Sequence, residues 1–204
     1  MPRFSLIVVD CDDHTPRESA RRGITAILAQ TFADFEVVLV HDGFKRIPYE
    51  AEFDLSGLDR VTTIYSKTRF RDWGHSLRRL GMRVAEGDYF LNVNIDNLLY
   101  PDCLAKVDGC LGRDGADIVI FSIVNHKRGT DVVRTGRPAA VGSIDCLQLV
   151  ASRRAWQSIG YWHRTDYQAD GHLYAELTAA YPARYLDDIL GENFQRGTRQ
   201  ATKE

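Results

Sequence analysis

Up to Val124, short apolar runs alternate with longer segments whose apolar positions recur at helical spacing. The runs are rich in branched and aromatic residues, which is typical of strands buried on both faces of a sheet. The predicted strands are Phe4–Val9, Phe35–Val40, Val61–Tyr65, Asp88–Val93 and Asp117–Val124. The predicted helices between them are Pro16–Gln30, Trp73–Ala85 and Pro101–Gly112. This alternation predicts an α/β fold with a mostly parallel central sheet.

The second half of the chain is less regular. A polar segment at Lys127–Arg137 predicts a hairpin or an exposed excursion. Helical spacing predicts a short helix at Arg154–Ile159 and an amphipathic helix at Asp170–Ala180, whereas Tyr185–Leu190 fits either a strand or a helix. The polar tail from residue 195 onward is expected to fray.

Acidic and amide side chains end three of the predicted strands. Asp10 and Asp12 follow the first, Asp42 follows the second, and Asn94 with Asp96 follows the strand that begins at Asp88. The carboxyl ends of parallel strands meet along one edge, where α/β proteins bind their ligands. The pattern therefore favours a site at this edge over a set of unrelated polar turns that cap helices.

Composition excludes some classes of function. The formal net charge of −2 gives no basic excess for a nucleic-acid partner. The four cysteines have no CxxC spacing, so they indicate neither a zinc site nor a disulfide framework. The first residues do not have the pattern of a signal peptide, and no apolar run approaches membrane-spanning length. We expect a cytoplasmic protein without a transmembrane segment, able to work at the membrane surface.

Four segments stand in a recognisable order. They are FSLIVVDCDD, ILAQTFADFEVVLVHDG, KTRF and GHSLRRLGMRVAEGDYFLNVNIDNLLYP. Together they resemble the inverting GT-A glycosyltransferases of the family 2 type, the group related to spore-coat polysaccharide transferases. The resemblance covers residues 4–113 well and residues 140–196 loosely. It implies one GT-A domain over residues 1–204, with a donor half (1–113), an acceptor half (114–196) and a polar tail (197–204).

The resemblance assigns donor contacts to matching positions. Asp42 would meet the nucleotide base, most often uracil, whose imide N–H a carboxylate can accept. Arg69 would lie near the base or the diphosphate, where a guanidinium suits an anion. Asp10 and Asn94 would complete the nucleotide site. The alternatives are a turn residue for Asp10 and Asp42 and a surface arginine for Arg69.

Asp96 falls on the metal-binding position of the family's DxD-type motif, which implies Mn2+ or Mg2+ bridging the diphosphate. The motif departs from the family pattern at Asn94 and Asn97, where acidic residues are commoner. An asparagine oxygen is a neutral, weaker ligand, so such a site would depend on Asp96, the diphosphate and water.

The catalytic base implied by the resemblance is Asp170, at the start of a predicted helix, with Asp166 as the second choice. Asp170 also suits a helix cap or a first-turn acid, stabilised by the helix dipole. His172 could reach a metal or a phosphate, or lie on an outer helix face. Trp156, Tyr161 and Trp162 could form a platform for a sugar ring, or pack in the core.

The sequence thus predicts a metal-dependent inverting transferase that moves a sugar from a nucleotide diphosphate, such as a UDP-sugar, to a saccharide acceptor. A degenerate module that binds nucleotide or glycan without turnover is the non-enzymatic alternative. A nucleotidyltransferase is less favoured, because it would need a glycine-rich basic loop after the first strand. That turn reads CDDHTPRE, which is acidic and contains no glycine.

Overall fold

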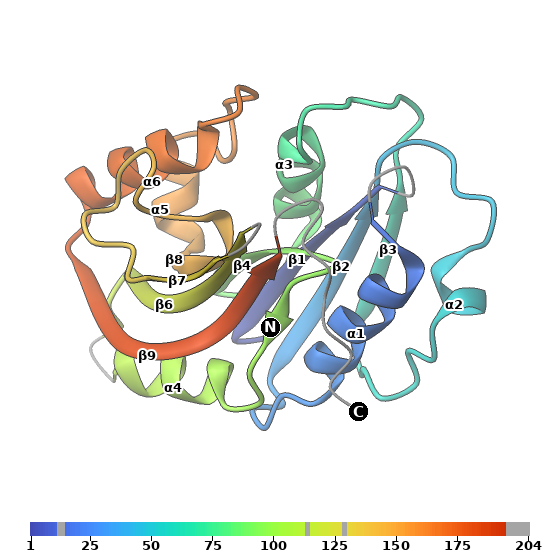
Figure 1. The fold of residues 1–204 in the computed structure, drawn as a ribbon, viewed down its shortest axis with the longest axis horizontal. Coiled ribbons are helices and arrows are strands. Elements are labelled where there is room, and N and C mark those ends of the chain that lie inside the picture. Colours follow the sequence, from blue (N-terminus) through green and yellow to red (C-terminus); the bar gives the residue numbers. More distant parts are fainter. Residues whose placement is uncertain (12–14, 113–114, 128–129, 195–204) are drawn as a thin grey trace.

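A computed structural model describes residues 1–11, 15–112, 115–127 and 130–194. The expectations for Asp12 and for the tail from residue 195 onward lie outside these residues. Within them one sheet has the strand order β3-β2-β1-β4-β8-β6-β9-β5, with β7 paired to β6 (Figure 1). Strands β5, β7 and β8 run opposite to the others, so the sheet is mostly parallel, as predicted.

The strands are β1 (Phe4–Asp10), β2 (Phe35–His41), β3 (Val61–Tyr65), β4 (Tyr89–Asn94), β5 (Leu98–Leu99), β6 (Ile118–Lys127), β7 (Thr130–Arg134), β8 (Leu149–Ser152) and β9 (Ala183–Phe194). The helices are α1 (Arg17–Leu28), α2 (Tyr49–Glu52), α3 (His75–Val84), α4 (Cys103–Leu111), α5 (Arg153–Ser158) and α6 (Ala169–Ala180), with a 3-10 turn, η1, at Cys146–Gln148. The expected strands and the five longer helices are all present.

Helices cover both faces of the sheet, which produces two hydrophobic cores (Figure 1). Strand β1 shows how they are separated. Phe4, Leu6 and Val8 pack with α1 and α4, whereas Ile7 and Val9 point to the other face, against the side of α3 and α6. Successive side chains of a strand point to opposite faces, so a continuous apolar run is what a sheet covered on both sides requires.

The three predicted polar strand ends meet at one edge of the sheet. Val9 of β1 is in register with Val40 of β2 on one side and with Asn94 of β4 on the other. Backbone hydrogen bonds continue this register past the strand ends, from Asp42 N–H to Asp10 C=O at 3.0 Å and from Ile95 N–H to Val9 C=O at 3.0 Å. The parallel pairing therefore fixes the relative positions of the three turns.

Two local expectations change in the structure. Leu98 and Leu99 form strand β5, and helix α4 starts at Cys103 and not at Pro101. The reason is long-range pairing, since Leu98 and Leu99 pair with residues 192 and 191 of β9, which no local pattern can reveal. The segment that fitted strand or helix equally is part of β9, and the polar excursion is the β6–β7 hairpin.

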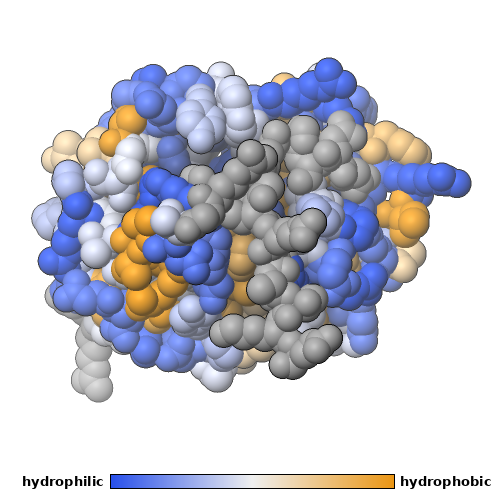
Figure 2. Space-filling model, in the orientation of Figure 1, coloured by the Kyte–Doolittle hydropathy of each residue, from blue (hydrophilic) through white to orange (hydrophobic). Residues whose placement is uncertain are grey.

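The outer surface in the Figure 1 orientation is largely hydrophilic, with hydrophobic side chains in small groups (Figure 2). Helices α1 and α6 have 12 residues each, or about 18 Å of helix. A bilayer core is about 30 Å thick. Within the described ranges, no helix is long and apolar enough to cross a membrane.

Candidate functional site

A cleft of about 400 Å³ lies at the edge where β1, β2 and β4 end. Asp10, Asp42, Asn94 and Asp96 all line it, so the fold brings four of the predicted site residues together. Arg71 and Trp73, from the segment before α3, form another part of its wall. We call this space the strand-end cleft.

A second cavity of about 580 Å³ adjoins the first. Asp170, Asp145, Arg78 and Arg134 bring charged groups to it, and Tyr167 adds an aromatic ring. Trp73 and Asn94 line both spaces, so the two share a wall. We call this space the α6 cavity. The predicted base Asp170 is thus next to the predicted nucleotide site, although the two are far apart in sequence.

The carboxylate of Asp10 is bonded to neighbouring side chains within the protein. Arg17 binds both of its oxygens, at 3.0 and 3.2 Å, and the Tyr49 hydroxyl donates to Oδ2 at 3.0 Å. The side chain is fully buried. Burial is the main cause, with the Asp10 charge second, of a pKa for Tyr49 far above its ordinary value. The Asp10 side chain therefore joins the end of β1 to Arg17 and Tyr49.

Asp42 orders the segment that leads into α3. Its Oδ1 accepts the N–H of Phe70 at 2.7 Å, and its Oδ2 accepts the N–H of Arg71 at 3.0 Å. Arg71 and Trp73 have positive φ angles of 57° and 58°. This left-handed conformation costs a residue with a side chain about 1 to 2 kcal/mol. The two charge-assisted bonds at Asp42 offset part of that cost and keep the segment against the cleft.

The arginine in the cleft is Arg71 and not the predicted Arg69. Arg69 is partly buried, and its side chain lies over Gly43, where an added Cβ would come within 3.3 Å of its Nε. Arg71 is exposed and lines the cleft. The role of Arg69 near the base or the diphosphate stays a prediction. The exposure of Arg71 could not be foreseen, because no glycine or asparagine signals the left-handed backbone at this position.

The turn after β4 is built from asparagines. Asn97 accepts the N–H of Asn94 at 2.9 Å, and its amide donates to Asn193 at 2.9 Å. Asn193 donates in turn to Asp145 at 2.7 Å, which links this turn to the α6 cavity. Helix α1 approaches the same turn closely at Gly23, where a Cβ would lie 1.9 Å from the Ile95 carbonyl oxygen. Only glycine fits at that point.

Few candidate metal ligands lie around Asp96 in the described part of the chain. In the described part of the chain, no three acidic, histidine or cysteine side chains form a metal-binding group. The Asn94 oxygen accepts a hydrogen bond from Arg78 at 2.5 Å, and both Asp42 oxygens accept backbone N–H groups. Mg2+ sites commonly use one or two carboxylates with substrate phosphates and water. Asp96 meets that requirement only together with a phosphate ligand.

Asp170 lies in the first turn of α6 and faces the α6 cavity. The helix cap is Gln168, so Asp170 is not the capping residue. Burial, and next the nearby Asp145 carboxylate, raise the pKa of Asp170 to about 6. A bond from the Gly171 N–H at 2.8 Å and the charges of Arg78 and Arg134 act in the opposite direction. A carboxyl with this pKa is ionised at neutral pH and basic enough to accept a proton.

The other acid–base candidates face outward. Asp166 is exposed and pairs with Arg164 at 2.9 Å, and its carboxylate accepts the Gln168 N–H at 3.2 Å. His172 lies on the exposed face of α6 and does not line the α6 cavity. The position of His172 matches its alternative of an outer helix-face histidine, and Asp166, the second choice of base, lies on the surface.

Of the two alternatives, sugar platform or core packing, the two tryptophans follow core packing. Trp156 and Trp162 are 0% and 1% exposed and stack on each other at 5.8 Å within the core beside α6. Two accessible aromatics lie at the α6 cavity: Trp73 and Tyr167 are 55% and 71% exposed, with ring centroids 5.6 Å apart. They line the α6 cavity together.

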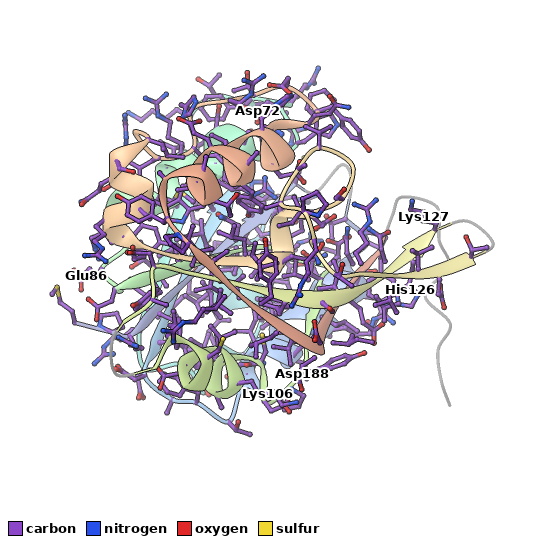
Figure 3. All side chains as sticks on the ribbon, turned by 90° about the vertical axis from the view of Figure 1, so that its left-hand side faces the viewer. Asp72, Glu86, Lys106, His126, Lys127 and Asp188 are labelled. Atoms are coloured by element: carbon purple, nitrogen blue, oxygen red, sulfur yellow. The ribbon has the colours of Figure 1, made fainter. Side chains whose placement is uncertain are left out.

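Asp72, just before Trp73, accepts the Ser76 N–H at 3.0 Å and lies near the start of α3 (Figure 3).

Comparisons with known proteins concern the family and the fold of the chain. The family model described as Glycosyl transferase family 2 matches residues 7–174. The structure of S. aureus TarS 1-349 is similar with a TM-score of 0.75 at 13% identity, covering 94% of this chain and 60% of that one. The complex of the same protein with UDP-GlcNAc gives 0.71 at 12% identity, covering 97% and 60%.

A third similar structure is the mannosyltransferase PcManGT from Pyrobaculum calidifontis in complex with GDP-Man and Mn2+. It has a TM-score of 0.71 at 19% identity and coverages of 94% and 56%. The chain therefore spans about 60% of the length of these structures or slightly less. At these identities the likeness concerns the fold, and it confirms the predicted GT-A architecture. The spore-coat subgroup stays a prediction.

Proposed function

The chain belongs to glycosyl transferase family 2, and we propose that it transfers a sugar from a nucleotide diphosphate to a saccharide acceptor with inversion. The observation that supports this most is the shared wall of the two cavities. A donor in the strand-end cleft and an acceptor in the α6 cavity would meet at Trp73 and Asn94, with Asp170 on the acceptor side.

The nucleoside is proposed to lie at the ends of β1 and β2. Asp42 is 5% exposed and uses two of its lone pairs on backbone N–H groups, so it can still accept an N–H from a base. Uracil and guanine both offer one. UDP is the proposed nucleotide, as in the UDP-GlcNAc complex of S. aureus TarS, and GDP, bound as GDP-Man by PcManGT, is the alternative to test beside it.

Asp170 is proposed as the general base. It takes the proton of the acceptor hydroxyl while that oxygen forms a bond to the anomeric carbon of the donor sugar. The bond from that carbon to the diphosphate oxygen breaks on the opposite face, and its electron pair leaves with the nucleotide. A single displacement of this kind inverts the anomeric centre. Trp73 and Tyr167 offer apolar ring faces beside the acceptor.

Asp96 is proposed to hold Mn2+ or Mg2+ together with the diphosphate. When bound, such an ion offsets charge that develops on the leaving phosphate. Asn94 and Asn97 add no charge to this site. Asp96 would therefore supply the carboxylate, while the neutral turn positions the backbone around it.

We expect activity to decline at acidic pH. Protonation of Asp170, with its pKa of about 6, removes the base, so kcat/KM should fall about tenfold per pH unit below that value and level off above it. A pH–rate profile measures this. Burial lowers the pKa of His75, the buried histidine of the same cavity, to about 4, which keeps it out of that window. An unchanged rate down to about pH 5 would exclude Asp170 as the titrating base.

Nucleotide binding is the direct test of the donor site. A ligand at about one hundred times its dissociation constant stabilises a protein by ~2.7 kcal/mol. We expect UDP or GDP to raise the unfolding midpoint, Mn2+ to increase the effect, and Asp96→Asn to remove only the increase due to the metal. Stabilisation by neither nucleotide, with or without Mn2+, would contradict the proposed function.

A binding module without turnover is the second candidate, and the asparagines at positions 94 and 97 favour it. Turnover separates the two. A transferase releases free UDP or GDP from the sugar nucleotide, faster when a saccharide acceptor is present. A binding module without turnover would be stabilised by the nucleotide but would release no free UDP or GDP from the sugar nucleotide.

A further inference from the structure

Arg78 of α3 is a buried cation with neutral partners. The residue is 2% exposed, and in the part of the chain that the structure describes no carboxylate lies within 4.0 Å of its guanidinium. Its Nη1 donates to the Trp73 carbonyl at 2.9 Å. Its Nη2 donates to Asn94 Oδ1 at 2.5 Å and lies 3.4 Å from Cys146 Sγ, and its Nε has no partner.

Such an arrangement is costly without an anion. A buried charge that lacks a counter-charge loses hydration that neutral acceptors replace only in part. The Trp162 ring, with its centroid 5.1 Å from the guanidinium carbon, recovers some of this energy through a cation–π contact. Asp170 of the same cavity interacts with Arg78 only through space. The unpartnered Nε, and the absence of a carboxylate within ion-pair distance among the described residues, leave capacity for an anionic ligand.

The position of Arg78 indicates which ligand. Arg78 lines the α6 cavity, and both residues that hold its terminal nitrogens, Trp73 and Asn94, line the two spaces at once. The guanidinium thus lies at the shared wall. In a donor that enters through the strand-end cleft, the β-phosphate is the group nearest the transferred sugar and therefore nearest this wall.

The identity of residue 94, which accepts a hydrogen bond from Arg78, determines whether the guanidinium keeps its charge. A carboxylate at position 94 would form an ion pair with the guanidinium and neutralise it, but the amide of Asn94 leaves its full charge. Neighbouring His75 does not compete for an anion. Its pKa is lowered to about 4 by burial and then by Arg78, so it is neutral near pH 7.

We propose that Arg78 is a built-in counter-charge for the β-phosphate of a nucleoside diphosphate, and that Asn94 keeps this charge available. The proposal rests on the proposed function. Arg78 then carries part of the phosphate charge whether or not a cation is bound at Asp96. Binding of the diphosphate should accordingly persist, in weakened form, in a chelator.

The test compares UDP with UMP, which lacks the β-phosphate, by calorimetry in EDTA and in Mn2+, with GDP and GMP as a parallel pair. Asn94→Asp is the main variant, because it changes no volume and pairs with Arg78. We expect on the order of a tenfold loss of affinity for the diphosphate in EDTA, a change within about twofold for the monophosphate, and recovery with Mn2+.

Arg78→Gln should give the same selective loss of affinity for the diphosphate in EDTA. It adds no carboxylate, so it should lack the recovery with Mn2+ that Asn94→Asp shows. Arg79→Gln, the next residue on the exposed face of α3, is the matched control and should bind as the wild type does. If Arg78→Gln does not fold, Asn94→Asp decides alone. Equal wild-type and Asn94→Asp affinities for the diphosphate in EDTA overturn this inference only. Wild-type protein that binds neither nucleotide in any buffer overturns the proposed function as well.

Discussion

Asp170→Asn is expected to reduce sugar transfer by about a hundredfold to ten-thousandfold while leaving nucleotide binding unchanged. The amide keeps the shape of the carboxyl and can still accept the Gly171 N–H, but it cannot take a proton from an acceptor hydroxyl. The strand-end cleft is not lined by Asp170, so the donor site stays intact. Initial rates with saturating donor, together with UDP affinity, measure both parts.

The fold of this variant gives an internal control. Burial disfavours the charged form of Asp170, which is why its pKa is raised. Relative to high pH, the raised pKa of Asp170 stabilises the folded protein fully below the ordinary carboxyl pKa. This stabilisation is lost as the pH rises through about 6. A neutral asparagine avoids the loss, so the variant should unfold at the wild-type temperature or above it at about pH 8. Lower activity then cannot be attributed to unfolding.

Asp166→Asn is the matched comparison, since it removes the exposed acid four residues earlier. It should keep wild-type activity, apart from the small effect of losing a surface pair with Arg164. Full activity in Asp170→Asn would rule it out as the base. Loss of activity in Asp166→Asn alone would transfer the role to that residue.

The sheet could be predicted because its strands are buried on both faces. Runs such as Phe4–Val9 have to be apolar at every position when helices cover both sides, and this signal is local. Strand β5 and the start of α4 could not be predicted in the same way. Both depend on β9, some ninety residues later, pairing with Leu98 and Leu99.

In the candidate site, the positions of residues could be predicted from the sequence, but the orientations of their side chains could not. The positions of Asp42 and Asn94 could be predicted because the strands before them are in register. The sequence signals where those strands end. The orientation of side chains did not follow. The Asp10 carboxylate is held by Tyr49, 39 residues away, and the Arg71 that lines the cleft has a left-handed backbone conformation. Neither has a signature in local composition.

The aromatic residues show a related limit. Tryptophan suits a sugar platform and a hydrophobic core equally well, and the sequence has no local feature that separates the two uses. Trp156 and Trp162 pack in the core, whereas Trp73 stays accessible because the positive-φ turn holds it beside Tyr167. The site therefore depends on a strained segment that the Asp42 carboxylate helps to keep in place, together with the bond from Arg78 to the Trp73 carbonyl.

Asp42→Ala should consequently affect both binding and stability. It removes two hydrogen bonds to a charged acceptor, each worth about 1.5 to 3 kcal/mol, and leaves the N–H groups of Phe70 and Arg71 without their partner. We expect UDP affinity to fall about a hundredfold or more, because the proposed base contact is lost and Arg71 and Trp73 leave their places. Calorimetry with UDP and denaturant unfolding measure the two effects.

Two further variants separate these causes. Asp42→Asn keeps the volume but can accept through one oxygen only, so its losses of affinity and stability should be intermediate. Asp54→Ala removes an exposed carboxylate bonded to Ser56 and should change neither. An Asp42→Ala protein that loses stability yet binds UDP as the wild type does would keep Asp42 as the anchor of the Phe70–Arg71 segment and exclude it as a contact to the base.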